Sequence, residues 1–235
     1  MTRSSVLLAV PLLALPALAS ADFYSHRYGG ISVGSVEQQN FCRSADSRIN
    51  RFDTDAQDVS GRSCENGSEV FKIYSGWRWT PNLAVEASVQ QLQDNRLGFT
   101  LSNDQDEFLQ IEEKVKTRLV TAHAVGHLPF FNGASFFAKA GGGYWMSELS
   151  SRLQGELLFP VVVEDEVQEQ LAAVNGRDRR ADNGFHWSYG AGISYRNENR
   201  WTIRAEWESF RNVGSDDLRG AYDLHTLSLG VSLHF

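Results

Sequence analysis

The strict alternation of apolar and small polar residues at the end of the chain constrains the fold more than any other feature. Every second residue from Leu227 to Phe235 is apolar, and the residues between them are Ser, Gly or His. A period of two places successive side chains on opposite faces of a β-strand. The same division recurs in residues 187–195 and 201–208. The chain is therefore predicted to be built from strands with one apolar and one polar face.

Such alternating runs predict eight strands, and their connections alternate in length. The three connections at residues 80–82, 129–133 and 197–199 are tight turns, whereas the others are long. An even number of strands with short periplasmic turns and long extracellular loops is the layout of an outer-membrane barrel. The predicted strands are residues 28–36, 69–79, 83–93, 115–128, 134–146, 184–196, 200–210 and 223–235, and the long loops are residues 37–68, 94–114, 147–183 and 211–222.

The polar face carries charged residues in the middle of its strands, and this decides the environment of the sheet. A soluble barrel buries its apolar face inside, whereas a membrane barrel turns that face to lipid. Eight strands leave an interior that side chains can fill, where opposite charges can neutralise each other. We therefore predict an all-β, eight-stranded, antiparallel up-and-down transmembrane β-barrel. The predicted inward-facing charged residues are Lys72, Arg78, Glu86, His123, Lys139, Arg204, Glu206 and Glu208.

The first 21 residues have the pattern of a secretory signal peptide. Arg3 precedes an apolar run that starts at Val6, and Ala19-Ser20-Ala21 supplies the small residues that signal peptidase cuts. The apolar run is too short for a membrane-spanning helix. A buried N-terminal helix is the alternative interpretation. The expected organisation is a signal peptide at 1–21 and one outer-membrane barrel domain at 22–235.

The two cysteines, Cys42 and Cys64, lie in one polar segment. Export would place them in an oxidising compartment, where two such cysteines are more often joined than free. We expect a disulfide between them, with two free thiols or a metal-binding pair as the alternatives. No metal site or cofactor is expected elsewhere, because His123 and His127 are too far apart on a strand to share one ion.

Aromatic residues cluster where the strands would cross the two membrane interfaces, as in the aromatic girdles of outer-membrane barrels. Ordinary enrichment of aromatics in strands is the alternative. The predicted girdle residues are Tyr28, Trp77, Trp79, Phe130, Trp201 and Phe235 near the short turns, and Tyr144, Trp187 and Phe210 near the long loops.

Several segments resemble the transmembrane domain of the outer membrane protein A family. The closing hairpin at 201–207 and 227–235, the glycine-bearing strands at 137–145 and 189–195, and the turn at 79–86 carry the resemblance. It implies that Phe235, after alternating apolar residues, belongs to the signal read by the barrel assembly machinery. The chain ends at Phe235, so the periplasmic peptidoglycan-binding domain of larger family members is not carried over.

The resemblance also implies a luminal salt-bridge network made by Glu86, Lys139, Arg204 and Glu206. Three of these residues, Glu86, Lys139 and Arg204, lie four to six residues from their short turns, so they have similar heights in the barrel. We favour a structural plug, with a small gated ion path as the alternative. His123 is a further candidate whose register the sequence does not fix.

Other motifs point to enzymes or ligands, each with an ordinary explanation. His186 and Ser188 are similar to the pair of outer-membrane lipid A deacylases, but Trp187 should face lipid and turn both toward the lumen. Residues 53–58 are expected to form a solvated acidic loop. The cluster from Arg177 to Arg180 has planar donors suited to lipid phosphates, or simply keeps a loop in water.

The expected function is non-enzymatic: a structural or surface-interaction role through the extracellular loops. A narrow, porin-like gated pore is the alternative, and a lipid-modifying enzyme using His186 and Ser188 is a third reading. The expected partners are outer-membrane lipid and lipopolysaccharide, the barrel assembly machinery and an extracellular ligand of unknown identity. A net charge of −7 argues against nucleic acid.

Overall fold

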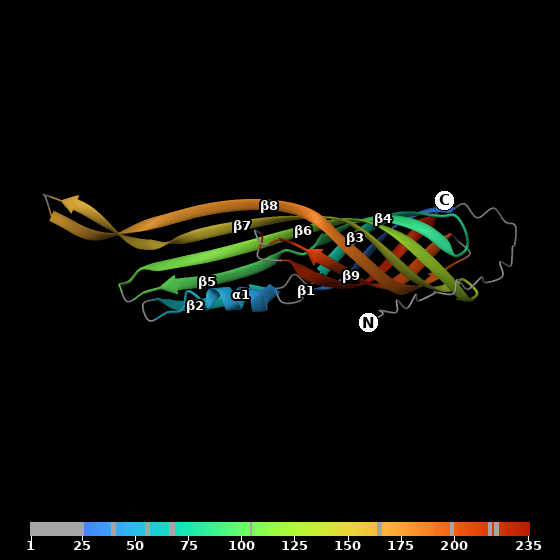
Figure 1. Cartoon of the computed structure of the whole chain (residues 1–235), viewed down its shortest axis with the longest axis horizontal. Helices are drawn as coiled ribbons and strands as arrows, with labels where there is room; N and C mark the ends of the chain where they lie inside the picture. The colour runs from blue at the N-terminus through green and yellow to red at the C-terminus, as the bar shows by residue number, and fades with distance from the viewer. Residues whose placement is uncertain are drawn as a thin grey trace, which may run out of the picture.

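A computed structural model describes residues 26–38, 41–54, 57–65, 69–103, 105–163, 166–197, 200–215, 218 and 221–235. The molecule is elongated, with a strand barrel at one end and a narrower sheet extending from it (Figure 1). The predicted signal peptide lies outside the described residues. Among the described residues, none of the helices is long and apolar enough to cross a membrane.

Eight antiparallel strands close the barrel in the order β1-β3-β4-β6-β7-β8-β9-β10, and β10 pairs with β1. All eight predicted strands are present, so the predicted fold class is confirmed. The β1 start and the β10 end both lie at the end of the short turns, since Tyr28 pairs with His234. The strands are β1 (His26–Gln38), β3 (Glu69–Arg78), β4 (Leu83–Leu92), β6 (Phe108–Phe131), β7 (Ala134–Val163), β8 (Glu166–Arg196), β9 (Trp201–Val213) and β10 (Tyr222–His234).

The apolar face of the barrel points outward, and the charged face points inward. Leu229 is 64% exposed and Ile193 is 51% exposed, whereas Arg204 is 7% and Glu206 is 1% exposed. An exterior of aliphatic and aromatic side chains suits hydrocarbon, and closure of the sheet leaves no backbone edge unpaired in it. The predicted orientation of the two faces is confirmed.

Beyond the barrel, three of the long connections form an ordered sheet. Strands β6, β7 and β8 continue well past the neighbouring barrel strands, and two short strands, β2 (Asp58–Glu65) and β5 (Asn95–Ser102), pair beside β6. We call the sheet of β2, β5 and the outer halves of β6, β7 and β8 the extension. The long connections at 94–114 and 147–183 are predicted from the sequence, whereas their internal structure is not. Most of their described residues form strands, and β6, β7 and β8 keep the register of the barrel throughout.

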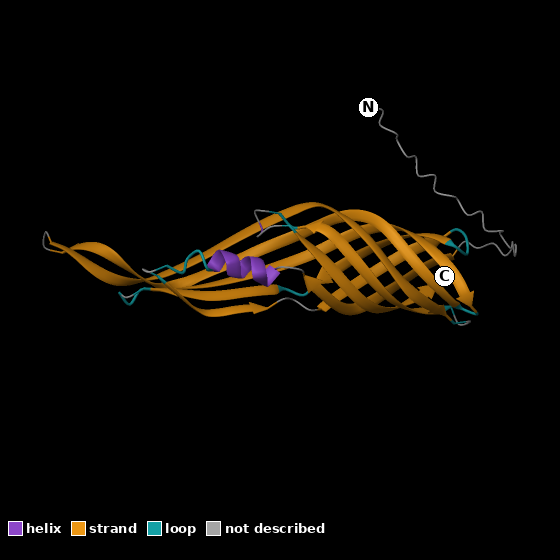
Figure 2. Ribbon diagram, turned by 60° about the horizontal axis from the view of Figure 1, so that its bottom comes forward, coloured by secondary structure: helices purple, strands orange, loops and turns teal. Residues whose placement is uncertain are grey.

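The helix α1 (Phe41–Ile49) covers one face of the extension (Figure 2). Ile49 is buried and packs with Leu97, Phe99 and Leu101 of β5. The predicted disulfide is present between Cys42 of α1 and Cys64 of β2, with a Cα–Cα distance of 5.9 Å. The described residues of the long connection at 37–68, whose structure the sequence does not predict, thus include a helix and a strand that are joined by a disulfide.

The interface aromatics mostly point outward, with two corrections. Tyr28 is buried because it lies on the luminal side of β1, as Ser32 does. Its cross-strand partner is Gly76, which leaves room for the Tyr28 ring. A Cβ atom at position 76 would lie 2.3 Å from that ring. Phe210 is fully buried on the luminal side of β9. The predicted aromatics that are well exposed are Trp77, Trp79, Phe130, Phe235, Tyr144 and Trp187.

Candidate functional site: the barrel lumen

The middle of the lumen holds three cations and three carboxylates, all buried. Glu86 comes from β4 and Lys139 from β7, whereas Arg204 and Glu206 lie two residues apart on β9. Their luminal position follows from strand alternation, because the outward neighbours on β9 are Ile203, Ala205 and Trp207. The four residues predicted from the sequence thus face one another across the barrel.

The four residues are joined by direct ion pairs. The Arg204 guanidinium donates two hydrogen bonds to the Glu86 carboxylate, at 2.6 and 2.9 Å, and a third to Glu206 at 2.5 Å. The Lys139 Nζ atom lies 2.9 Å from Glu206 and 3.6 Å from Glu86. Because both lysine and arginine contact both carboxylates, the four side chains form one network.

Two further residues join this network. Lys72 of β3 lies 2.7 Å from Glu208 and also contacts Glu206, and Glu208 lies 2.6 Å from Lys139. The sequence placed both residues on the luminal face but not in the network. The available signal was the spacing of Arg204, Glu206 and Glu208 on alternate positions of one strand, which puts all three on one side.

Polar and aromatic side chains surround the charges. The Tyr28 hydroxyl donates to Glu86 at 3.1 Å, and the Ser228 hydroxyl donates to Glu206 at 3.3 Å. The Arg204 guanidinium lies 3.9 Å from the centre of the Tyr74 ring, within the range of a cation–π contact. Equal numbers of opposite charges with added hydrogen bonds make burial of the group tolerable, because the desolvation of each ion is offset by several partners.

The histidines of the lumen lie beside the network. His123 of β6 is the cross-strand partner of Glu86, and its Nε2 atom is 2.8 Å from the Ser188 hydroxyl. His186 is fully buried and its Nε2 atom is 3.0 Å from the Thr121 hydroxyl. His186 and Ser188 therefore both face the lumen, on the opposite side of β8 from the exposed Trp187.

The outer end of the lumen is filled by an apolar cluster that the alternating pattern of the sequence does not predict. Its members are luminal residues near the long-loop ends of the strands, and none is more than 6% exposed. The charged network and this cluster thus form two packed layers across the barrel. The cluster, which we call the apolar seal, comprises Val36, Val70, Leu92, Val115, Leu119, Trp145, Leu149, Phe210, Val213, Leu218 and Leu224.

A cavity of about 170 Å³ enters the lumen from the short-turn end. It is lined by Arg78, His127 and His234 and reaches Glu86 and Arg204 at its inner end. One side of the charged network is thus reached from the short-turn end, and the apolar seal lies toward the long-loop end. Arg78, predicted as a luminal charge, lines this mouth.

The comparison with protein families agrees with this architecture. The family model for the outer membrane protein beta-barrel domain matches residues 5–235. A search of curated protein sequences found no significant match.

Among solved structures, the chain is similar to the attachment invasion locus protein Ail of Yersinia pestis, crystallised with the heparin analogue sucrose octasulfate. That alignment has 15% identity, a TM-score of 0.43 and coverage of 90% of this chain and 99% of Ail. The neisserial surface protein A aligns with 10% identity and a TM-score of 0.38, covering 90% and 97%. The N-terminal barrel of OprF from Pseudomonas aeruginosa aligns with 11% identity and a TM-score of 0.35, covering 90% and 99%.

Proposed function

Because this chain belongs to the family of outer membrane protein beta-barrel domains, and so lies in the outer membrane of a Gram-negative bacterium, we propose that it is a closed, non-enzymatic barrel. Its role is to anchor the extension at the cell surface, where the extension makes contacts. The observation that carries this proposal is the filled lumen beneath a long, ordered sheet.

The packing of the lumen supports a barrel that does not conduct. An ion entering from the short-turn end meets the paired charges of Lys139, Arg204 and Glu206, each at most 7% exposed. Beyond them it meets the apolar seal, where dehydration of an ion is costly. Opening a path requires both layers to rearrange, so the arrangement favours the structural plug over the gated pore.

The extension supports a role in surface contacts. In outer-membrane barrels the short turns face the periplasm and the long connections face outward, so the extension projects from the cell. Its strands are held by the barrel register and by the Cys42–Cys64 disulfide. An ordered sheet presents its side chains at fixed positions, which lowers the entropic cost of binding.

The luminal position of His186 and Ser188 supports a non-enzymatic role. A deacylase needs its nucleophile and base open to the acyl chain, and in this barrel both residues are at most 3% exposed. Mass spectra of lipid A from cells that express the protein should be unchanged. A lipid A species that loses an acyl chain in these cells, and regains it with Ser188→Ala, would contradict this part of the proposal.

Planar-bilayer recording tests the closed barrel. We expect no conductance steps from the purified protein, and a leak when the seal is opened by the Leu119→Ser/Trp145→Ser variant, which serves as the positive control. Outward-facing Val120→Ser is the matched control and should stay silent. Regular conductance steps in the wild-type protein that change with Arg204→Ala would favour the gated pore and overturn the proposal.

We also propose that residues 1–21 are removed on export and that Phe235 is part of the assembly signal. The first is supported by the Ala19-Ser20-Ala21 sequence, and the second by the exposed aromatic ring at the end of β10. N-terminal sequencing of the membrane form should begin at Asp22. Phe235→Ala should slow assembly into the membrane, whereas Leu83→Ala, an outward change of similar kind on β4, should not.

A further inference from the structure

The outward side of the extension gathers cations although the chain as a whole is acidic. Seven basic side chains lie on this face of β5, β6, β7 and β8, with Glu65, Asp94, Glu112 and Glu148 among or beside them. On the other side of the barrel rim, the exposed ends of β1 and β3 carry Glu37 and Glu69 instead. The basic residues, which we call the basic face, are Arg96, Lys114, Lys116, Arg118, Arg152, Arg177 and Arg179.

The strand register sets these residues in rows. Arg96, Lys114 and Arg179 belong to one row, completed by Ser150 of β7, and Arg152 lies directly opposite Arg177 in the next. Neighbouring strands are about 4.8 Å apart and residues of one face about 7 Å apart along a strand, so the cations form a compact two-dimensional array. A cavity of about 670 Å³ lies on it. Its charged lining residues are Arg96, Lys114, Arg152, Arg177 and Arg179, with Glu65, Glu112, Glu113 and Asp178.

Carboxylates neutralise this array only in part, since seven cations face Glu65, Asp94, Glu112 and Glu148, three of which lie directly opposite Arg96, Arg152 and Lys116. Lys114 pairs with Asp94 at 2.6 Å, and Arg179 pairs with Glu148 at 3.1 Å in an exposed position. In the described part of the chain, Arg96, Lys116, Arg152 and Arg177 have no acidic partner within salt-bridge distance. Like charges directly opposite each other on a sheet are unfavourable. The row of Arg152 and Arg177 has Glu112 as its one carboxylate, so it keeps a net positive charge that an external anion can neutralise.

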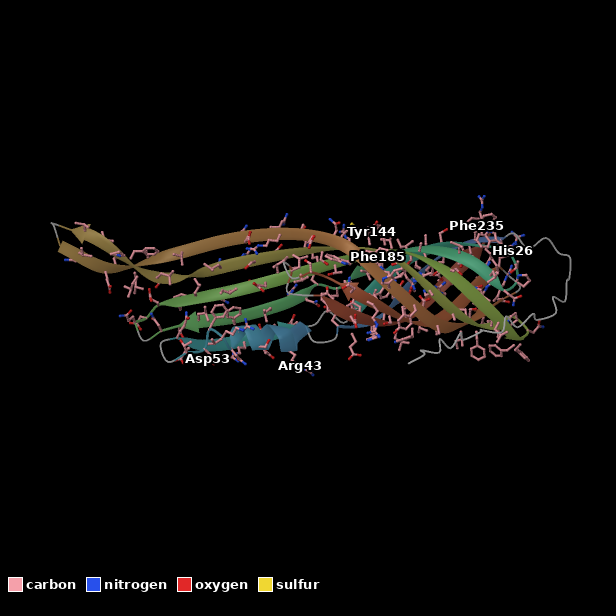
Figure 3. All side chains as sticks on the ribbon, viewed as in Figure 1. His26, Arg43, Asp53, Tyr144, Phe185 and Phe235 are labelled. Carbon is pink, nitrogen blue, oxygen red and sulfur yellow. A yellow bond between two sulfur atoms is a disulfide. The ribbon has the colours of Figure 1, made fainter. Side chains whose placement is uncertain are left out.

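The basic face is a direct continuation of the lipid-facing surface. Along β7 and β8 the outward positions pass from Tyr144 to Arg152 and from Trp187 through Phe185 to Arg179, with no shift of register. Figure 3 labels Tyr144 and Phe185 at the level where the long strands leave the barrel. A molecule that lies against the barrel wall with its apolar part therefore has its polar part beside the cations.

We propose that the basic face binds the phosphorylated sugars of an anionic glycolipid of the outer leaflet, whose acyl chains lie against the barrel below. The proposal rests on the membrane barrel of the proposed function and names its partner. Arginine donors pair bidentately with phosphate, and the acyl chains supply a second contact on the exposed aromatic rings. A soluble polyanion would pair with the cations but would make no contact with the apolar barrel wall next to them.

Glycolipid retention by the protein in nanodiscs tests this. The full chain is reconstituted with lipopolysaccharide in three arms: intact lipopolysaccharide, phosphatase-treated lipopolysaccharide, and no glycolipid with dextran sulfate in solution. The test variant is Arg152→Gln/Arg177→Gln. The matched control is Arg51→Gln/Arg180→Gln, which removes the same charge from outside the basic face, with Arg180 on the opposite side of β8.

We expect the wild type and the control to bind intact lipopolysaccharide at least roughly tenfold more tightly than the test variant, an effect of about 1.4 kcal/mol or more. Removal of the phosphates should abolish most of that difference. Equal binding by the test variant, or a dextran sulfate affinity that equals or exceeds that for lipopolysaccharide, overturns the proposal. For each variant, heat-modifiable gel migration reports whether the barrel is folded. Planar-bilayer recording reports whether the barrel is closed. A failure to fold and a failure of the proposed closed barrel are thus distinguished from a loss of glycolipid binding.

Discussion

Strand β6 passes through two regions of the molecule, and its apolar face changes sides between them. In the barrel its outward residues are Val120, Ala122 and Ala124, and its inward residues include His123. In the extension the outward residues are Lys114 and Glu112, whereas Leu109 and Ile111 pack under α1 on the other side. The outward face of one uninterrupted strand thus contacts hydrocarbon in the barrel and water in the extension.

The difference shows that solvent, and not the strand, decides which face is apolar. In lipid the outer face of the sheet must be apolar, and the charged side chains lie in the lumen, where they form ion pairs. In water the outside is polar, and the apolar side is covered by a helix, as in a soluble sheet packed on one face. The boundary lies between Lys114 and Val120 on β6, close to the level of the exposed Tyr144.

The largest expected effect is a loss of barrel stability when the charged network in the lumen is disrupted. Arg204→Ala leaves Glu86 without its bidentate partner in a buried site, and removal of one partner from a buried ion pair costs about 3–5 kcal/mol. Urea unfolding in lipid vesicles measures the loss. The double variant Arg204→Ala/Glu86→Gln should recover part of it, since the uncompensated charge is gone. A loss under about 1 kcal/mol, or no recovery, contradicts the account of the network.

The second prediction concerns the disulfide, which joins α1 to β2 outside the barrel. Cys42→Ser/Cys64→Ser removes a bond between residues that are 22 apart in the sequence, which in the chain-entropy model is worth about 3 kcal/mol. The loss should be confined to α1 and β2, because the barrel closes without them. Hydrogen exchange over 41–65 should quicken while the unfolding midpoint of the barrel stays the same. A lowered barrel midpoint would show that the extension and barrel unfold together.

A smaller effect sharpens the comparison along β6 itself. Ala124→Lys puts a charge on the lipid side of the barrel and should cost about 2 kcal/mol or more. Gln110→Lys puts the same charge on the same side of the same strand, in the extension, and should change the free energy of unfolding by under about 0.5 kcal/mol. The two variants are measured together in vesicles. Similar costs for both would mean that the outward face meets one environment throughout.

The sequence predicts the barrel well because lipid imposes a regular pattern on it. Alternation located all eight barrel strands and placed Arg204 and Glu206 in the lumen. It failed where the phase of the pattern reverses: Leu109 and Ile111 lie on the luminal side of β6, so the expected strand began at residue 115. Residues 175–183 of β8, including Arg177 and Arg179, are polar on both sides and resemble a solvated loop.

Other parts of the site had weaker signals. In α1 the spacing of Cys42, Ala45 and Ile49 is that of one helical face, but nine residues form too short a segment to stand out. The apolar seal was hidden because residues such as Phe210 and Trp145 are apolar on the inward side, where the barrel pattern predicts polar groups. Their role depends on neighbours from six other strands, which no local pattern contains.

Site-directed labelling along β6 tests the reversal of environment most directly. Single cysteines replace outward residues in the extension, at Gln110, Glu112 and Lys116, and in the barrel, at Val120, Ala122 and Ala124, with the native disulfide left oxidised. The account predicts fast reaction with a water-soluble maleimide at the first three positions, and slow reaction with strong quenching by a lipid-soluble quencher at the last three. Equal reactivity along all six positions would contradict it.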